Sequence, residues 1–241
     1  MVNNCSSKNN KATQIAGESF KLNYRLKDLC KLTLNHENNY VFYYILKSVK
    51  NINHSLVQIG TGPNIEGEVI SLCTCKHKNR TSENIKEGSW IAGISNKENG
   101  NFLFYLMKIQ KTFQNQKNLY EYYLKNNLYK SIKIKDANKN NYGDLFIPLR
   151  NIKDPYNPLN YTFNNKEHCH FEGNEWYDDI MKYELNVFGK KYLKEHKLLL
   201  GNSSLSFVWT KGDLKYDNEL TLKRQNPLIS LHDFLNLFKQ L

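Results

Sequence analysis

Segments typical of β-strands follow one another along this chain, with few long helical segments between them. Residues 41–46 (Val-Phe-Tyr-Tyr-Ile-Leu) form a β-branched and aromatic run that is long enough for a buried strand. Further strand candidates are residues 69–75, 90–94, 102–109, 197–200 and 205–209. A doubly wound nucleotide-binding fold would alternate strands with long helices, which this chain does not do. We therefore expect an α+β fold, a single domain around a mixed, partly barrel-like β-sheet with short helices.

Helical spacing of apolar residues is confined to short segments. It predicts an amphipathic helix within residues 20–34, another over 119–128, and a last one in which Asn226 caps and Pro227 opens a helix running to Phe238. These segments suggest three parts: an N-terminal extension (residues 1–38), a main domain (39–210) and a C-terminal extension (211–241). The first 17 residues and the segment 130–175 are expected to be largely irregular.

The charge of the chain favours contact with polyanions. The formal net charge is +11, from 34 Lys and Arg against 23 Asp and Glu, and such a surplus attracts nucleic acid or nucleotides. A composition rich in Asn, Lys, Ile and Tyr offers a second explanation, because AT-rich coding sequence produces it without selection for binding. Five sparse cysteines, no apolar signal segment and no stretch of membrane-spanning length predict a cytoplasmic protein without membrane association.

The most informative stretch for function runs from Gly60 to Arg80. Its first part is a glycine-containing loop in which Gly60, Gly62 and Asn64 are candidates for close approach to a nucleotide, although an ordinary strand connection explains them too. Three cations follow at alternate positions, Lys76, Lys78 and Arg80. If strand geometry continued through them, all three would line one edge of a groove and contact phosphates. A solvated strand end is the alternative.

A lysine-rich segment with interleaved tyrosines lies further along the chain. Residues 108–139 hold eight lysines, together with Tyr120, Tyr122, Tyr123 and Tyr129. Aromatic rings among cations suit the stacking of bases. Tyrosines at helical spacing more often pack against a core, which is the interpretation we favour here.

Candidate catalytic groups are a thiol, a carboxylate and an imidazole. Cys75 stands beside Lys76, and a neighbouring cation favours the thiolate. His168 or His170 could act as its base if the fold brings them together. The Cys and His residues at positions 73–77 and 168–170 match no familiar zinc spacing, so we expect no metal site. An acidic cluster at residues 172–179 is either a solvated face or a site for a cation.

The run from Gly60 to Lys76 resembles the signature of the nucleotide modification associated domain 2 family. That family reads Gly-Phe-Ala-Pro-Asn, then Gly and a short apolar strand, then Thr-Leu-x-x-Cys-Lys-Pro, with Gly-Asp-Trp-Ile-x-Gly later; residues 88–93 (Gly-Ser-Trp-Ile-Ala-Gly) match the last block. Tyr142-Gly143-Asp144 is similar to a Gly-Asp loop of the family. This chain departs at Thr61, Gly62, His77 and Ser89, where the family has Phe, Ala, Pro and Asp.

The resemblance implies an association with DNA base modification and does not identify a reaction. The family occurs beside enzymes that modify DNA bases in phages and bacterial mobile elements. The strand and Gly-x-Trp-Ile pattern is also similar to PUA-like barrels such as EVE and ASCH domains, which recognise nucleic acid or modified bases in a pocket. If the protein binds a nucleotide, Trp90 would support or stack on the base. If it is an enzyme, the candidate catalytic groups are Cys75, Asp144 and His168 or His170.

Three functions follow from these observations. The first is a nucleotide or nucleic-acid binding protein acting in DNA base modification or in recognition of modified bases. The second is an enzyme acting on a nucleotide or nucleobase. The third is a protein-interaction module of a phage or bacterial defence system. The sequence identifies no cofactor, and it leaves open whether the protein is an enzyme.

Overall fold

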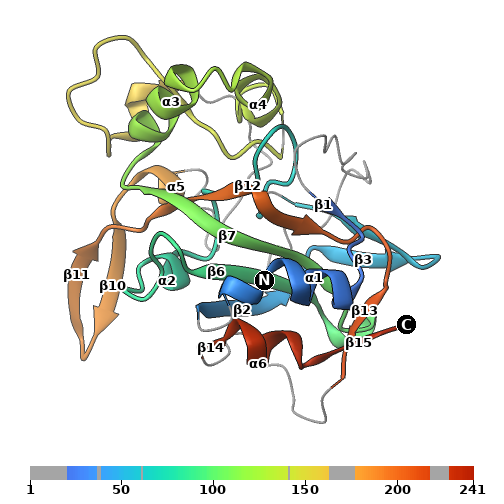
Figure 1. Ribbon diagram of the computed structural model, residues 1–241. Coiled ribbons are helices and arrows are strands. Elements are labelled where there is room, and N and C mark those ends of the chain that lie inside the picture. Colours follow the sequence, from blue (N-terminus) through green and yellow to red (C-terminus); the bar gives the residue numbers. More distant parts are fainter. Residues whose placement is uncertain (1–20, 37–38, 61, 141, 163–176, 218–227) are drawn as a thin grey trace. The chain divides into compact units, whose positions relative to one another are not determined.

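The computed structural model describes residues 21–36, 39–60, 62–140, 142–162, 177–217 and 228–241 (Figure 1). The chain divides into two compact units. Of the described residues, those between 60 and 85 and between 111 and 200 form unit 1, and those between 21 and 59, 86 and 110, and 201 and 241 form unit 2. The sequence-based division at residues 38 and 210 stays a prediction.

A seven-stranded mixed sheet is the largest element of the fold, in the order β1-β12-β7-β6-β2-β14, with β5 also paired to β12. Its strands are β1 (Lys21–Leu22), β2 (Tyr40–Leu46), β5 (Ser71–Leu72), β6 (Trp90–Ser95), β7 (Leu103–Phe113), β12 (Leu198–Val208) and β14 (Ile229–Ser230). The β2–β6 and β1–β12 pairs are parallel, whereas β6–β7, β5–β12 and β2–β14 are antiparallel. An α+β fold around a mixed sheet is therefore confirmed. The described strands do not close into a barrel.

Unit 2 is built on the apolar runs that the sequence marked as strands. Every residue of β6 is buried, as is typical of a central strand covered on both faces. There is no room for a side chain at position 93, because a Cβ added to Gly93 would lie 2.3 Å from Leu46 Cδ1. The hydroxyls of Tyr44 and Tyr105 share a hydrogen bond of 2.9 Å within this core. These strands form where predicted because their burial leaves a continuous apolar pattern in the sequence.

Short elements complete unit 2. They are α1 (Leu26–Leu32), η1 (Leu34–His36), η2 (Lys97–Asn99), α6 (Leu231–Leu235) and the paired strands β3 (Val49–Ile52) with β4 (Ser55–Gln58) and β13 (Leu214–Tyr216) with β15 (Phe238–Gln240). The expected C-terminal helix is wrong in extent over the described residues, and its predicted cap Asn226 and first-turn Pro227 lie outside them. Ser230, whose hydroxyl accepts from the Asp233 N–H, caps a helix of five residues, and Phe238 already belongs to β15.

Unit 1 carries most of the remaining helices. They are α2 (His77–Arg80), α3 (Gln116–Lys125), α4 (Tyr129–Lys135), η3 (Pro158–Asn160) and α5 (Tyr177–Ile180). Two short sheets accompany them, β8 (Ile147–Pro148) with β9 (Tyr161–Thr162) and the hairpin of β10 (Tyr183–Val187) with β11 (Lys190–Lys194). Segment 130–162 is therefore more ordered than the sequence suggested. The apolar core of unit 1 contains, among other residues, Val69, Cys73, Leu119, Tyr123 and Leu198.

The predicted strand over residues 69–75 is much shorter in the structure. Only Ser71 and Leu72 pair with β12, and the chain then turns into α2. The two late strands expected at residues 197–200 and 205–209 are instead one strand, β12. No helix in the described residues is both long and apolar enough to cross a membrane.

Candidate functional site

Asn64 organises the glycine-containing loop of unit 1. Its backbone N–H donates to the Ser71 carbonyl at 2.8 Å, and the Ser71 N–H donates back to the Asn64 carbonyl at 3.0 Å. Its side-chain Nδ2 donates to the Tyr142 carbonyl at 3.1 Å, while Oδ1 accepts from the Glu66 N–H at 3.0 Å. The buried amide therefore ties this loop to the loop that carries Gly143 and Asp144.

A lysine ammonium lies inside this arrangement. Lys135, at the end of α4, is fully buried, and its Nζ donates to the Asn64 carbonyl, Asn64 Oδ1 and Ser71 Oγ, each at 2.9 Å. Burial lowers the pKa of Lys135, while the carboxyl of Asp144 acts in the opposite direction. Three acceptors match the three donors of an ammonium, so the lysine is a fully bonded part of the loop structure.

Asp144 faces this group as its buried counter-charge. Its side chain is 1% exposed, and neither carboxylate oxygen has a hydrogen-bond partner among the described residues. Burial raises the pKa of Asp144, whereas Lys135, Ser71 and Cys73 lower it. Ser71 and Cys73 therefore lie close enough to the carboxyl to stabilise its charged form. Asp144 thus has two acceptor atoms available in a protein interior, where polar groups are almost always paired.

Gly143 explains how the chain reaches this position. A Cβ at Gly143 would lie 2.5 Å from the Lys135 carbonyl oxygen and 2.7 Å from the Ala137 nitrogen. Both are backbone atoms, which cannot rotate away. Glycine is therefore required here, and it brings Asp144 close to the end of α4.

Other polar atoms in unit 1 are also buried without a hydrogen-bond partner among the described residues. They are Thr74 Oγ1, Arg80 Nη2, Tyr123 Oη and His196 Nδ1. Burial raises the pKa of Tyr123 well above its usual value, and the Cys73 thiol is shifted in the same direction by burial and by Asp144. We call Asn64, Ser71, Cys73, Tyr123, Lys135 and Asp144 the polar centre of unit 1.

Arg80 and Asp179 form a second buried charge pair. Arg80 is fully buried and donates from Nε to the Cys75 carbonyl and from Nη1 to the Lys197 carbonyl, each at 2.8 Å. Its Nη2 lies 3.9 Å from Asp179 Oδ1. Burial lowers the pKa of Arg80, while Asp179 and Cys73 oppose this. The electrostatic influence of Cys73 and Asp144 on Arg80 links this pair to the polar centre.

Asp179 also holds a histidine and the backbone of Cys75. Its Oδ1 accepts from the Cys75 N–H at 3.1 Å and lies 2.8 Å from His77 Nε2. The ring of His196 lies 4.8 Å from that of His77, and burial, Arg80 and His77 lower the pKa of His196 to about 3. His196 is therefore a neutral imidazole at ordinary pH, with Nε2 placed to donate to the Asp179 carbonyl at 3.2 Å.

Comparison with known proteins decides the family. The family model described as nucleotide modification associated domain 2 matches residues 41–185, more than half of the chain. The chain belongs to the nucleotide modification associated domain 2 family. No curated protein and no solved structure matches it.

The residues that carry this family resemblance have structural roles in the polar centre. Asn64 connects two loops, and Gly62 packs so tightly that a Cβ would lie 3.3 Å from Leu72 Cδ1 and from the Thr74 carbonyl oxygen. Gly60 adopts a φ of 141°, which favours glycine. The nucleotide modification associated domain therefore uses its glycine loop to build the surroundings of Lys135 and Asp144.

The expected row of three cations is wrong. It required a strand through residues 76–80, whereas residues 77–80 form α2. Lys78 is exposed, Lys76 is half-buried, and Arg80 is fully buried with two of its nitrogens on backbone carbonyls. Only Lys76 and Lys78 remain placed to contact a phosphate from solvent.

The other candidates lie in different places. Trp90 is fully buried in β6 of unit 2, where its ring lies 6.0 Å from that of His36. Cys75 is half-buried at the start of α2, beside Asp179, and is not in a disulfide. His168 and His170 lie outside the described residues, as does most of the acidic cluster. Among the described residues, no group of three or more His, Cys, Asp or Glu side chains is arranged to hold a metal ion.

Sequence reasoning missed Lys135 and His196 and did not resolve the role of Asp179. A lysine in a short helix is usually exposed, and nothing in its neighbours signals that Asn64, 71 positions away, supplies its acceptors. Asp179 belonged to an acidic cluster whose role was left open. Its partner His77 is 102 positions away, so spacing alone could not pair them.

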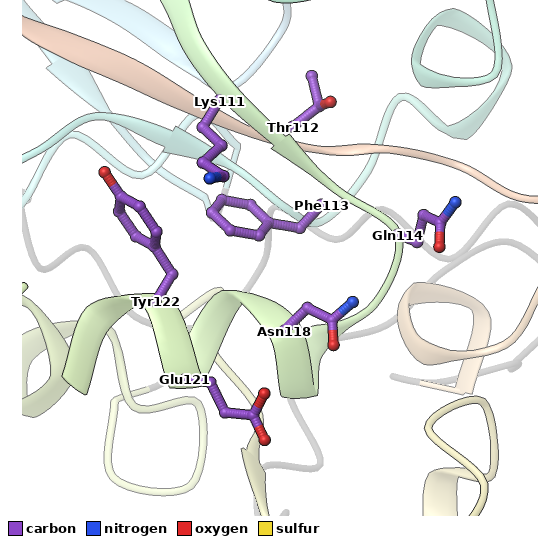
Figure 2. A pocket seen from close by; sticks show the side chains of 7 residues that line it. All are labelled: Lys111, Thr112, Phe113, Gln114, Asn118, Glu121 and Tyr122. Atoms are coloured by element: carbon purple, nitrogen blue, oxygen red, sulfur yellow. The ribbon is translucent and has the colours of Figure 1, made fainter. Parts of the chain in front are cut away.

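An open surface pocket lies between β7 and α3 (Figure 2). Its lining residues are Lys111, Thr112, Phe113, Gln114, Asn118, Glu121 and Tyr122. The rings of Phe113 and Tyr122 lie 5.2 Å apart, and Lys111 Nζ lies 5.2 Å from the centre of the Tyr122 ring. Tyr123 is buried and Tyr120 and Tyr122 pack against the core of unit 1, so packing is confirmed for these three tyrosines.

Proposed function

We propose that this protein binds a nucleotide, free or within nucleic acid, at the polar centre of unit 1, and that binding serves base modification or the recognition of modified bases. The family match supports an association with nucleotide modification. The observation that carries the proposal is Asp144, a buried carboxyl whose two oxygens make no hydrogen bond of good geometry with the described residues, beside a fully bonded lysine.

The chemistry of this carboxyl fits a nucleobase edge. An ionised carboxylate accepts two hydrogen bonds side by side, which matches neighbouring ring N–H and exocyclic amine donors. Leaving such acceptors unpaired costs free energy, so a ligand that supplies the donors gains affinity. The positive charge of Lys135 stabilises the ionised Asp144 carboxylate, and the hydrogen bonds of Asn64 hold the surrounding loops in place.

Phosphate contact would come from Lys76 and Lys78. Both stand at the start of α2, next to Cys75, which reaches the edge of the buried groups. Ammonium groups at this position can meet the phosphates of a nucleotide whose base lies deeper. Arg80 has a positioning role, because its bonds to the Cys75 and Lys197 carbonyls fix the backbone of this turn.

Binding of a panel of mononucleotides, followed by native mass spectrometry and calorimetry, tests this function. Asp144→Asn keeps the shape of the side chain but replaces one acceptor by a donor, so it should weaken binding at least tenfold. Lys76→Glu with Lys78→Glu should weaken binding without lowering the melting temperature. Lys153→Glu, at an exposed lysine elsewhere in unit 1, is the matched control. Unchanged affinity in Asp144→Asn would remove the polar centre as the site.

A second function, catalysis on a nucleotide, is favoured by the geometry around Cys75. Cys75 and Lys76 have φ values of 58° and 54°, which side-chain-bearing residues seldom adopt and which often mark functional sites. Asp179 holds both the Cys75 N–H and His77 Nε2, so a thiol, an imidazole and a carboxylate converge on one turn. His77 would then replace His168 as the base of the predicted set.

Turnover assays separate the two functions. Nucleotides and modified DNA would be incubated with the protein and with Cys75→Ser and His77→Gln, and products followed by mass spectrometry. Catalysis predicts product formation that both variants abolish while nucleotide binding persists. Binding without any product, in all three proteins, supports recognition alone.

A further inference from the structure

The hairpin of β10 and β11 is a two-stranded sheet that no third described strand joins (Figure 1). Its five antiparallel pairs run from Tyr183 with Lys194 to Val187 with Lys190. Only residues 183–185 fall within the span that matches the family. Two-stranded hairpins are marginally stable alone in water, so such an element usually gains stability from a partner.

The tip of the hairpin carries Phe188, an unusual residue for its backbone conformation. Phe188 and Gly189 form the two-residue loop, with φ values of 51° and 75°, as in a type I′ turn. Asn, Asp or Gly normally occupies the first of these positions, because a bulky side chain is strained at positive φ. The Phe188 side chain is 100% exposed. An aromatic ring that costs stability and is fully exposed indicates a role outside the fold.

One face of the hairpin carries apolar and aromatic residues together with Lys190 and Lys194. Pairing places Leu185 opposite Tyr192 and Val187 opposite Lys190 on the same face. Tyr192 is 45% exposed and Val187 38% exposed. Together with the exposed Phe188 at the tip, they place several exposed apolar side chains on one short hairpin, which indicates an interaction site.

The charge of the hairpin selects the kind of partner. Lys190, Lys191 and Lys194 stand on β11, and the acidic Glu184 lies 3.8 Å from Lys191. Lys190 adjoins the aromatic tip and Lys194 stands at the base of the hairpin opposite Tyr183, and neither is paired with an acidic side chain among the described residues. Two such ammonium groups along one hairpin complement a polyanion whose interior is built of stacked bases.

The base of the hairpin adjoins the polar groups already described. The Tyr183 ring lies 5.1 Å from that of His77, which binds Asp179. Five residues of strand then extend roughly 16 Å to the tip. That reach exceeds the depth of a DNA groove, about 8 Å.

We propose that this hairpin is a nucleic-acid wedge. Phe188 inserts into the base stack of duplex DNA and fills the gap left by a nucleotide that is displaced toward the polar centre. Lys190 and Lys194 bind phosphates of the DNA backbone. Apolar wedges of this kind open base steps, and enzymes that act on bases extrude the target nucleotide. The inference rests on the proposed function, because it supplies the step that would present a base to the polar centre.

Binding to two labelled DNA duplexes tests the wedge by fluorescence anisotropy. One duplex is fully paired, and the other has a single abasic site that leaves a gap in the stack. The unmodified protein should prefer the abasic duplex about tenfold, since stacking on an aromatic side chain supplies that much discrimination. Phe188→Asn should abolish the preference.

The choice of asparagine keeps the test clear of misfolding. Asn-Gly is the favoured pair for a type I′ turn, so Phe188→Asn should leave the melting temperature unchanged or raise it. Leu159→Asn removes another exposed apolar side chain of unit 1, which is 72% exposed, and should keep the preference. Lys190→Ala with Lys194→Ala should weaken both duplexes alike and reduce the slope of log K against log salt by about 2.

Three outcomes would overturn the wedge. They are absence of duplex binding by the unmodified protein, a preference retained in Phe188→Asn, and an effect of Phe188→Asn on self-association alone, which would make the face a protein interface. Mononucleotide binding separates this inference from the function on which it rests. Phe188→Asn should leave mononucleotide affinity intact, whereas Asp144→Asn should reduce it.

Discussion

The ammonium of Lys135 and the side-chain oxygen of Asn64 lie 2.9 Å apart in the interior of unit 1. The same oxygen accepts from the Glu66 N–H, and the amide nitrogen donates to the Tyr142 carbonyl. Every polar atom of the Asn64 side chain is thereby engaged. The pair joins α4 to the glycine-containing loop, and stability and binding should both depend on it.

Lys135→Met should lower the free energy of unfolding by about 3–5 kcal/mol. The substitution keeps most of the apolar stem but leaves Asp144 without its buried counter-charge and removes three hydrogen bonds from Asn64 and Ser71. Urea denaturation measures the change. Lys133→Met, at an exposed position of the same helix, should change stability by less than about 0.5 kcal/mol. Equal effects of the two substitutions would contradict the role given to Lys135.

Arg80→Met should be similarly destabilising, by about 3–5 kcal/mol, because it removes the buried guanidinium near Asp179 and the two hydrogen bonds that Arg80 donates to the Cys75 and Lys197 carbonyls. Lys78→Met, on the exposed side of α2, serves as the control and should stay near the parent stability. Thermal and urea unfolding measure both. A folded, fully stable Arg80→Met protein with weakened nucleotide binding would restore Arg80 as a direct phosphate contact.

His196 should make the protein sensitive to acid. Its pKa is lowered to about 3 from 6.5, so between these values the unfolded state binds the proton that the folded state excludes. Stability is therefore lost as the pH falls from about 6.5 toward 3, at up to about 1.4 kcal/mol per pH unit from this residue. His196→Gln should flatten the pH dependence of unfolding in this window. His232→Gln, at an exposed histidine of α6, should leave the slope unchanged.

Gly143→Ala should destabilise unit 1 by about 1–3 kcal/mol, because the added methyl group would meet backbone atoms of residues 135–137. Gly88→Ala is an informative comparison. A Cβ there meets nothing within 4 Å, so only the cost of its φ of 88° applies. If Gly88→Ala proved the more damaging in urea denaturation, backbone crowding at Gly143 would not be the cause.

The parts of the fold that were predictable are those in which burial leaves a local pattern. β2, β6 and the start of β7 are continuous apolar runs, and they form where the sequence placed them. The strand predicted over residues 69–75 was too long because apolar residues can also be buried in a turn. Here the backbones of Asn64 and Ser71 hydrogen-bond to each other. The last helix was overextended because Phe238, at helical spacing, pairs in β15.

The candidate site was predictable only in part. The family motif pointed to Asn64 and Asp144, and the structure puts both in the polar centre. Their partners come from segments far along the chain, and no spacing rule connects Asn64 with Lys135 or Cys75 with Asp179. Arg80 was expected on a groove edge or at a solvated strand end because strand geometry was assumed through residues 76–80, whereas here backbone carbonyls and a carboxylate compensate its burial.

The exposed Phe188–Gly189 loop also makes the hairpin a natural cleavage point for chymotrypsin, which cuts after aromatic residues, because proteases favour exposed loop tips. A cut there would separate β10 from β11 while leaving the five backbone pairings to hold the fragments together. The nicked protein would elute from a size-exclusion column at the same volume as the intact protein but give two bands on a denaturing gel. DNA that covers the tip would slow this digestion, so protease sensitivity would report occupancy of the hairpin in a crude sample.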